Sequence, residues 1–521
     1  MAVSLLTLSP FATVFAGPIQ VLAPVVNADG RLGLCDVLSG NVPGQSGTTW
    51  AQLAYNAGAR INRWEFRWDR IEPRRAHWDF SATDAVVSGD QQAGIGVEGI
   101  IDGTPGWGSG KGQPPGNGVP KGLRLPITDS RNLWADFIRG LVAHYRGQVK
   151  YWEIWNEPDL AFFWHGTAND YYRLLRVAYR TIKQVDPSAQ VLIAGMVDPS
   201  MSFLQHVLDD GARYGTAPAQ RAFDIASWHA YGAARSLYWN LLKLRHLIAI
   251  RGFGTVPIWV TEDGFPASDP NGIPRQAAYV LQSIAYALAA GADKVLVYRA
   301  SDDPLPKTWG LVSSSGVPRP GYVAFQVAAE YLASTQVVSY VPTGNLERFV
   351  FYQPDRRITL MWNRGIKDQT FSVPAGHPTI SAIDWQGVTS ALTPIAGAIQ
   401  VTAPGASYDA GGVDPRAAIV GGPPVLLAED NTAPSNLSNQ TYLTPVSGAN
   451  RSLLVLNPGD TPSTVQVSAS NRPNERQVVQ LAPQSLGTID LDLLSGRNYH
   501  GMYLLSSTTP ILGEAASTRA T

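Results

Sequence analysis

The sequence of 521 residues has a single cysteine, Cys35, which excludes a disulfide framework and a metal site built from thiolates. It also lacks any run of about 20 apolar residues, the length that a membrane-crossing helix needs. The chain also has no excess of charge of either sign, because 40 Lys and Arg residues nearly balance 41 Asp and Glu residues and leave a net charge of −1. Such a surface gives no electrostatic reason to expect DNA, RNA or an anionic lipid as partner.

Several catalytic signatures are also missing. No Gly-rich phosphate loop follows the first expected strand, and no Gly-x-Ser-x-Gly motif indicates a serine hydrolase. No His, Cys or Asp spacing indicates a metal site, so we predict neither a metal nor a cofactor. Aromatic side chains are present in number, at 10% of the chain with 15 Trp. These rings suit both the apolar faces of sugars and an ordinary core, so composition leaves that choice open.

Short apolar strands alternate with amphipathic helical segments over residues 31–334, from "LGLCDV" to "GYVAFQVAAEYLA". The alternation gives eight strand–helix units. Strands separated by helices favour right-handed crossovers and a parallel sheet, and eight units of this length fit a closed (β/α)8 TIM barrel of the α/β class. The alternative, an open doubly wound sheet, would usually show the phosphate loop that is missing here.

The helical period disappears after residue 334. Segments such as "ERFVFYQPDRRITLMWNRG" and "AIQVTAP" are typical of strands between turns, and predict a β-sandwich over 335–428 and a second all-β domain over 429–521. Residues 1–30 begin with "MAVSLLTLSPFATVFAG", an apolar run without the positive start of a secretion signal. A signal remnant and a disordered or packed N-terminus are therefore equal alternatives. We expect an extracellular or cell-surface protein, with the cytoplasm as the open alternative.

Two glutamates lie at strand ends of the expected barrel. Glu157 follows the fourth strand in "YWEIWNEPDL", where Pro158 stops the hydrogen-bond ladder, and Glu262 closes the seventh strand in "PIWVTEDGF". Because the carboxyl ends of barrel strands share one face, both side chains should line one cleft. Two facing carboxyl groups can cut an acetal, since one protonates the leaving oxygen while the other attacks the anomeric carbon. Glu153, earlier in the fourth strand, is expected inside the barrel or paired with a base.

The "WNEP" and "TEDGF" motifs resemble clan A of the glycoside hydrolases, over about residues 30–335. With "YWEIWNEP" and "SWHAYG" the chain is most similar to the family 39-like group, which carries a trailing β-sandwich. The resemblance implies a retaining enzyme with Glu157 as general acid/base and Glu262 as nucleophile. It places the two carboxyl groups about 5–5.5 Å apart. Asn156 would then bind the 2-hydroxyl of the sugar being cleaved.

Three further polar residues match the clan by the same resemblance. Arg63, in "INRWEF", corresponds to the arginine beside the nucleophile, and would keep Glu262 ionised. His229 and Tyr231, in "SWHAYG", correspond to the polar pair near the nucleophile. Arg63 could instead pair with Glu65 or Asp69, and His229 could be an ordinary buried core histidine.

The aromatic positions agree less well with the clan. Many relatives carry a Trp on the eighth strand as a floor for the sugar, but this chain has "VLVYRASDD", so Tyr298 or Trp309 would take that place. Trp107, in the Gly- and Pro-rich loop "GTPGWGSGKGQPPGNGVPKGLR", and Trp164, in "LAFFWHG", are candidate sugar platforms. For both tryptophans, simple packing is the alternative.

Together these features predict an O-glycosyl hydrolase that cleaves β-linked oligo- or polysaccharide with retention, through a covalent glycosyl-enzyme. The alternatives are a carbohydrate-binding barrel protein without turnover, and a transglycosylase that uses the same residues. Family 39-like relatives include xylosidases, iduronidases and enzymes acting on exopolysaccharide, so the resemblance selects a carbohydrate partner without selecting the sugar.

Overall fold

The structure is a computed structural model of the chain. Two compact units are present: Met1–Leu244 with Val256–Asp430, and Arg245–Thr255 with Asn431–Thr521. The structure describes residues 5–7, 20–26, 28–217, 220–253, 256–268, 272–302, 308–335, 337–340, 342–353, 356–406, 408–409, 418–430, 439–443, 449–457, 462–469, 472–482, 485–491, 503–507 and 512–518.

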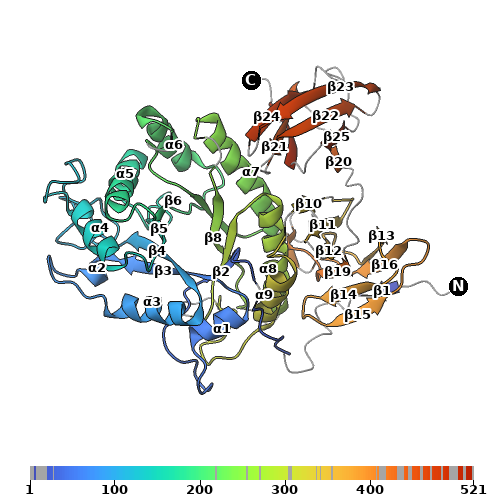
Figure 1. Ribbon diagram of the computed structural model, residues 1–521, viewed down its shortest axis with the longest axis horizontal. Coiled ribbons are helices and arrows are strands. Elements are labelled where there is room, and N and C mark those ends of the chain that lie inside the picture. The colour runs from blue at the N-terminus through green and yellow to red at the C-terminus, as the bar shows by residue number, and fades with distance from the viewer. Residues whose placement is uncertain are drawn as a thin grey trace. The chain divides into compact units, whose positions relative to one another are not determined.

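Eight parallel strands form one sheet in the order β6-β5-β4-β3-β2-β9-β8-β7 (Figure 1). A parallel bridge between Leu192 and Ile225 joins the two ends of this order and closes the ring. The predicted (β/α)8 barrel is therefore confirmed. Its strands are β2 (Leu32–Cys35), β3 (Ile61–Arg67), β4 (Gly96–Asp102), β5 (Tyr151–Ile154), β6 (Gln190–Ile193), β7 (Ala226–Tyr231), β8 (Ile258–Gly264) and β9 (Lys294–Val297).

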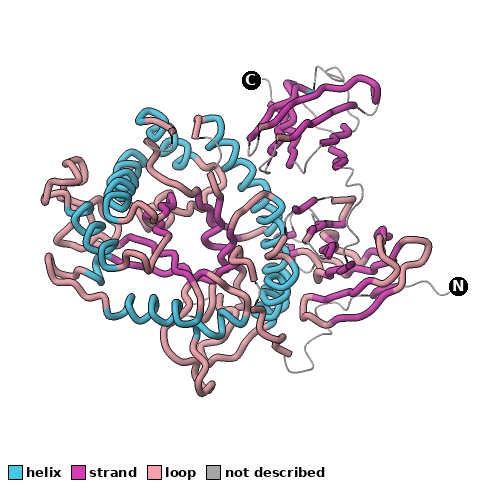
Figure 2. The backbone as a smooth tube through the Cα atoms, viewed as in Figure 1, coloured by secondary structure: helices cyan, strands magenta, loops and turns pink. Residues whose placement is uncertain are grey.

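Helices surround these strands as an outer ring (Figure 2). The helix α5 shows why the sequence folds this way: Thr167 and Asp170 form a reciprocal capping box at its start. Its buried residues recur at helical spacing, as expected for a helix with one apolar face. The helices are α1 (Trp50–Asn56), α2 (Trp68–Ile71), α3 (Ser81–Ala93), α4 (Leu133–His144), α5 (Ala168–Val185), α6 (Ser202–Tyr214), α7 (Ala234–Ile250), α8 (Gly272–Ala289) and α9 (Pro320–Tyr331).

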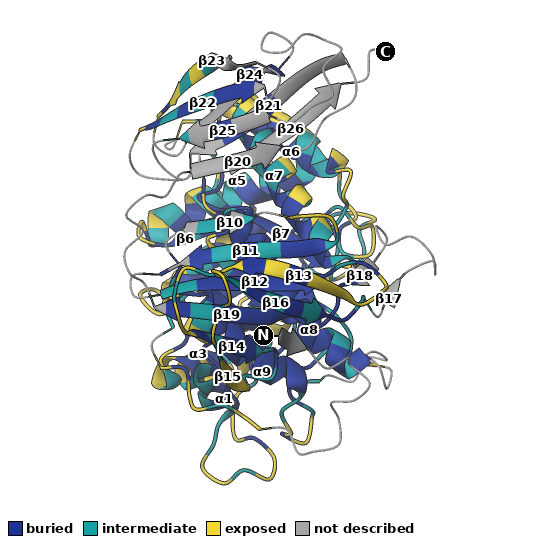
Figure 3. Cartoon of the chain, turned by 90° about the vertical axis from the view of Figure 1, so that its right-hand side faces the viewer, coloured by how far each residue is buried: buried dark blue, intermediate teal, exposed yellow. Residues whose placement is uncertain are grey.

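The first β domain consists of two facing sheets, which confirms the predicted sandwich. The larger sheet has the order β10-β11-β12-β19-β14-β15 and the smaller has β1-β16-β13. One apolar cluster, which includes Met361, Val401 and Leu427, joins both sheets. In Figure 3 the strand β13 alternates exposed and buried residues, as expected for a sheet with one solvated face. The strands are β1 (Leu5–Thr7), β10 (Val337–Tyr340), β11 (Leu346–Tyr352), β12 (Arg356–Asn363), β13 (Gln369–Pro374), β14 (Ile380–Asp384), β15 (Thr389–Leu392), β16 (Ala398–Ala403) and β19 (Val425–Asp430), with the short pair β17 (Tyr408–Asp409) and β18 (Ala418–Val420) beside them in the sequence.

This sandwich is joined to the barrel by hydrogen bonds from α8. The side chain of Gln282 accepts from the backbone of Gly421 at 2.9 Å and donates to the carbonyl of Gly422 at 3.0 Å. At the other end of the chain, Leu5–Thr7 pairs in parallel with β16. Part of the N-terminal segment is thus a strand of the sandwich.

The second all-β domain also has two sheets, β20-β25-β22-β23 and β24-β21-β26. Leu453, Val467 and Leu505 belong to its apolar core. Its strands are β20 (Asn439–Leu443), β21 (Ala449–Asn457), β22 (Ser463–Ala469), β23 (Arg472–Leu481), β24 (Ser485–Asp490), β25 (Tyr503–Ser507) and β26 (Leu512–Thr518). Within the described ranges, no helix has the length and apolar character that crossing a bilayer requires.

Candidate active site

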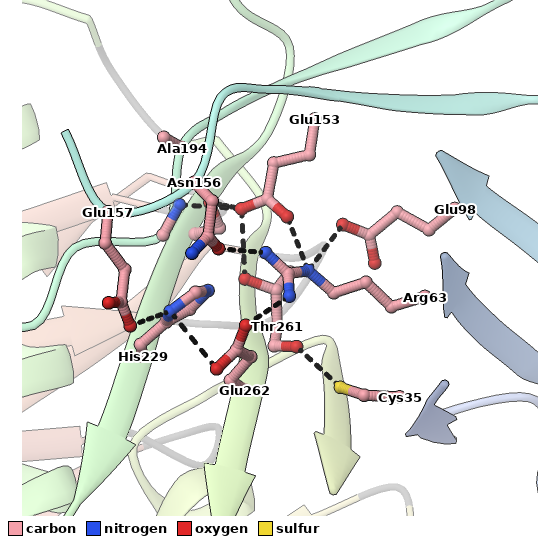
Figure 4. Close-up of polar contacts among 12 residues, drawn as sticks. Cys35, Arg63, Glu98, Glu153, Asn156, Glu157, Ala194, His229, Thr261 and Glu262 are labelled. Atoms are coloured by element: carbon pink, nitrogen blue, oxygen red, sulfur yellow. Dashed lines mark hydrogen bonds and ion pairs between the residues drawn. The ribbon is translucent and has the colours of Figure 1, made fainter. Parts of the chain in front are cut away.

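Glu157 and Glu262 both lie at the carboxyl-terminal face of the barrel, after β5 and within β8 (Figure 4). The strand β5 ends at Ile154, and the chain then turns out of the sheet, with φ of 76° at Trp155 and 42° at Glu157. Non-glycine residues seldom adopt such angles, and those that do are concentrated at functional sites. A hydrogen bond of 3.2 Å from the backbone N–H of Glu157 to the carbonyl of Gly195 holds this turn.

The structure brings both glutamates together around one histidine. One side-chain ligand atom from each of Glu157, His229 and Glu262 lies within 4.8 Å of the other two. The two carboxyl groups therefore approach each other across a short gap. Their side chains keep 9% and 10% of their surface exposed, so solvent still reaches both groups.

Arg63 connects the nucleophile candidate to the rest of the site. Its guanidinium donates to Glu262, to Glu153 at 2.7 Å and to the amide oxygen of Asn156 at 2.9 Å. Only 3% of the residue is exposed. A planar fork with five donors suits such a set of three acceptors better than a lysine would.

The alternative pairing of Arg63 with Glu65 or Asp69 is wrong. Glu65 is exposed on β3, and Asp69 accepts hydrogen bonds from Arg67 at 2.9 and 3.0 Å. The carboxylates that Arg63 pairs with are those of Glu98, Glu153 and Glu262.

The surroundings of Glu262 favour its ionised form. Burial alone would raise the pKa of Glu262, but the charges of His229 and Arg63 and hydrogen bonds from Tyr231 and Arg63 lower it below its ordinary value. Burial and the nearby Glu262 charge raise the pKa of Tyr231 well above its ordinary value, so its hydroxyl stays a donor. The oxygen atoms of Glu262 are thereby held in place as an anion.

His229 is in direct contact with the other carboxyl group. Its Nδ1 lies 2.8 Å from Glu157 Oε1 and 3.7 Å from Glu262 Oε2, and the residue is 1% exposed. Burial lowers the pKa of His229, but the charge of Glu262 and the hydrogen bond to Glu157 outweigh this effect and raise it. His229 is thus buried as in the core-histidine alternative, yet its partners are the two candidate catalytic groups.

Sequence reasoning missed Gly195, which lies against this histidine. A Cβ atom there would lie 2.1 Å from Cδ2 and 2.2 Å from Nε2 of His229, closer than real contacts. The position therefore accepts only glycine unless the imidazole moves. Gly195 follows β6 in "QVLIAG", and nothing in that stretch of sequence indicates that it lies against His229.

Glu153 lies inside the barrel and is paired with a base, as expected. Its Oε1 accepts from the backbone N–H of Gly195 at 2.6 Å and from the hydroxyls of Ser227 and Thr261 at 3.1 and 3.2 Å. Burial alone would raise the pKa of Glu153, but the charges of Arg63 and His229 lower it. Burial and the charge of Glu153 raise the pKa of the adjacent Glu98 well above its ordinary value. We expect a neutral Glu98, which leaves Glu153 and Glu262 to share the charge of Arg63.

Three aromatic rings cluster beside Glu262. Tyr231, Tyr298 and Trp309 meet edge to face, with ring centroids 5.5–6.1 Å apart. All three keep part of their surface exposed. The structure thus places both sequence candidates for the sugar floor next to Tyr231, whose hydroxyl contacts the nucleophile candidate.

The two other tryptophan candidates differ in exposure. Trp107 is half-buried, donates to the carbonyl of Glu72 at 3.1 Å and packs edge-on against Trp68. Trp164 is only 3% exposed and donates to Thr167, so its burial supports the packing alternative over a sugar platform. In the same loop Phe162 is 76% exposed, and sequence reasoning did not name it as a candidate.

Glu157, His229 and Glu262 also offer the donor types that bind metal ions. However, His229 Nδ1 is directed at Glu157, and the Arg63 guanidinium already lies against Glu262. Since the protein's own cation occupies the place beside the carboxylate, a metal ion would meet repulsion there.

Two β-xylosidases are among the known proteins that match the chain. The chain is 26% identical over 220 residues to a β-xylosidase of Caldicellulosiruptor saccharolyticus, covering 37% of this chain and 44% of the relative. It is 28% identical over 247 residues to a β-xylosidase of Geobacillus stearothermophilus, covering 39% and 47%. The alignments thus span less than half of either relative. No protein-family model matches the chain.

Among solved structures, a family 39 glycoside hydrolase from Bacteroides cellulosilyticus superposes with a TM-score of 0.61 and 20% identity, over 78% of this chain and 82% of that one. The chain resembles family 39 glycoside hydrolases. The resemblance stated from the "WNEP" and "TEDGF" motifs is confirmed by these comparisons.

Proposed function

We propose that this protein is a retaining β-glycoside hydrolase, with Glu157 as the general acid/base and Glu262 as the nucleophile. The observation that carries the proposal is the approach of the two side chains to within 4.8 Å. Retaining enzymes hold their carboxyl groups about 5–5.5 Å apart, whereas inverting enzymes need about 6.5–9.5 Å to fit a water molecule. The spacing therefore supports direct attack by one carboxylate.

In the first step, Glu262 attacks the anomeric carbon while Glu157 gives a proton to the leaving oxygen. The C–O bond to the leaving group breaks as the bond to Glu262 forms, which gives a covalent glycosyl-enzyme. Arg63 and Tyr231 stabilise the anionic Glu262 before attack and orient it. In the second step Glu157 removes a proton from water, which attacks the same carbon and restores the original configuration.

Asn156 has a defined orientation for substrate binding. Its amide oxygen accepts a hydrogen bond from Arg63, which leaves the amide N–H groups as donors. These donors suit the oxygen of the 2-hydroxyl group on the sugar being cleaved. Such a contact strengthens in the transition state and contributes to rate more than to binding.

The relatives named β-xylosidases make β-D-xylosides the first substrates to test. We expect hydrolysis of an aryl β-D-xyloside, and NMR should detect the β-anomer as the first product. A 2-deoxy-2-fluoro xyloside should add one sugar mass to the peptide that contains Glu262. The α-anomer as first product, or a label on another peptide, would refute the mechanism.

The same assay separates the two alternative functions. A transglycosylase would transfer the xylosyl group to an added sugar acceptor in preference to water. A carbohydrate-binding protein without turnover would bind xylo-oligosaccharides and release no product.

We also propose that the protein acts outside the cell or at the cell surface, where polysaccharide substrates would be found. Cell fractionation with N-terminal sequencing of the mature chain tests this. Recovery of the protein in the cytoplasmic fraction alone would overturn it.

A further inference from the structure

A hollow of about 360 Å³ lies in the outer layer of the barrel, lined by residues 123–127 and by side chains of α5 and α6. We call it the α5 hollow. None of its lining residues belongs to the cluster around Glu157 and Glu262. These lining residues include no Asp or Glu, but they include four arginines: Arg124, Arg173, Arg176 and Arg180.

Three of the arginines lie on one face of α5, at positions i, i+3 and i+7. Arg173 donates to the uncharged amide of Asn169 at 3.1 Å, and the Arg176 guanidinium lies 4.2 Å from the ring centroid of Tyr214. Among the ion pairs of the described residues, only Arg124 of the four has a carboxylate partner, Asp170 at 3.5 Å. Arginine stays charged at every physiological pH, so Arg173, Arg176 and Arg180 bring three positive charges to the hollow without an ion-pair partner among the described residues.

A buried hydroxyl group in the same hollow has no partner. Tyr172 lines the hollow and is 1% exposed, and its hydroxyl oxygen makes no hydrogen bond with the described residues. Its ring stacks on Tyr214, with centroids 5.5 Å apart, which fixes its position. A buried polar group without a partner is costly, and a ligand oxygen in the hollow would satisfy it.

We propose that the α5 hollow binds an acidic glycan, whose sugar carboxylates pair with Arg173, Arg176 and Arg180 and accept a hydrogen bond from Tyr172. Guanidinium groups bind carboxylate and sulfate through paired hydrogen bonds, so the shared chemistry is an oxyanion on a sugar. The choice of a glycan rests on the proposed glycosidase function. The net charge of −1 argues against a nucleic acid, which would require a broad basic surface.

The test is calorimetric titration of the full-length protein with tetragalacturonate. The neutral methyl ester of that tetramer, a sulfated tetrasaccharide and a single-stranded DNA oligomer are compared with it. Two triple variants remove the same charge: Arg173→Gln/Arg176→Gln/Arg180→Gln in the hollow, and a control at three exposed arginines outside it, Arg70→Gln/Arg74→Gln/Arg146→Gln. A third variant, Tyr172→Phe, removes only the hydroxyl group.

We expect tetragalacturonate to bind, its methyl ester to bind at least about ten-fold more weakly, and the hollow variant to lose at least about ten-fold in affinity while the control variant does not. Tyr172→Phe should weaken binding about ten-fold without lowering the melting temperature, since the hydroxyl has no partner to lose. Tighter binding of the sulfated tetrasaccharide with the same variant pattern would assign the oxyanion as sulfate.

Equal binding of the neutral ester, equal loss in both triple variants, or preference for DNA would each overturn the proposal. Hydrolysis of an aryl β-D-xyloside is measured separately on the same samples. Binding without hydrolysis would count against xyloside cleavage and leave the acidic-ligand site standing. Hydrolysis without binding would overturn only the site.

Discussion

Replacing Gly195 with alanine tests whether His229 must lie against Glu157 for turnover. The new Cβ would lie 2.1 Å from His229 Cδ2, against an ordinary carbon–carbon contact of about 3.5 Å, so the imidazole must move by about 1.4 Å. Its 2.8 Å contact with Glu157 would then be lost. Displacement of a catalytic group by about 1 Å can cost about 100-fold in rate, and overpacking costs about 1–3 kcal/mol of stability.

The assay is kcat/KM for an aryl β-D-xyloside, with circular dichroism and thermal melting to confirm that the variant is folded. Gly89→Ala is the matched control, because nothing lies within 4 Å of a Cβ atom at that half-buried position in α3. It should keep full activity and gain up to about 1 kcal/mol in stability.

A double-mutant cycle separates an effect through the histidine from a general one. If Gly195→Ala acts by displacing His229, adding it to His229→Ala should cost little more than His229→Ala alone. Additive losses in the double variant, or wild-type kcat/KM in folded Gly195→Ala, would refute this reasoning.

The remaining predictions concern the charged groups of the same site. Glu262→Ala should lose about 10⁴-fold or more in kcat, and azide should partly restore turnover with an α-glycosyl azide as product; undiminished turnover would remove Glu262 as nucleophile. Arg63→Met should destabilise the fold by about 3–5 kcal/mol in urea unfolding, because it leaves Glu153 and Glu262 buried without their cation; an unchanged midpoint would contradict this role. His229 has a raised pKa, so its charge contributes stability that is fully present below pH 6.5, its ordinary pKa, and is lost as pH rises through the folded value. The melting-temperature difference between the wild type and His229→Gln should therefore shrink with rising pH, and a constant difference would count against a charged His229. Glu262 has a lowered pKa, so its charge contributes stability that is fully present above pH 4.5, its ordinary pKa, and is lost as pH falls through the folded value. The melting-temperature difference between the wild type and Glu262→Gln should therefore shrink as pH falls below 4.5.

The helices and strands of the barrel could be predicted because each has a strong local pattern. The segment 168–185 has an apolar helical period and a capping box, and the structure has α5 over those same residues. Strand ends have a weaker local signal: the apolar run "VKYWEIW" continues to Trp155, but β5 stops at Ile154, where the backbone turns out of the sheet. No local pattern marks that turn, since it depends on a hydrogen bond to Gly195.

The aromatic positions show where sequence reasoning ends. Trp164 and Phe162 are two residues apart in one loop, and the sequence made Trp164 a candidate sugar platform with simple packing as the alternative. The structure buries Trp164 against Trp155 and leaves Phe162 at the surface. Burial of a loop side chain depends on which elements pack beside it, and that information is not local.

The sequence by itself determined the barrel, the sandwich after it and the pair of glutamates at strand ends, because periodicity and strand termini are properties of short segments. Only the tertiary structure decided what those glutamates touch: which carboxylates share Arg63, that His229 contacts Glu157, and that Gly195 must be small. Arg63, Glu157 and Glu262 are separated by about a hundred residues each along the chain. Their charges interact only because closure of the barrel buries them within hydrogen-bonding distance, where a low dielectric strengthens every contact.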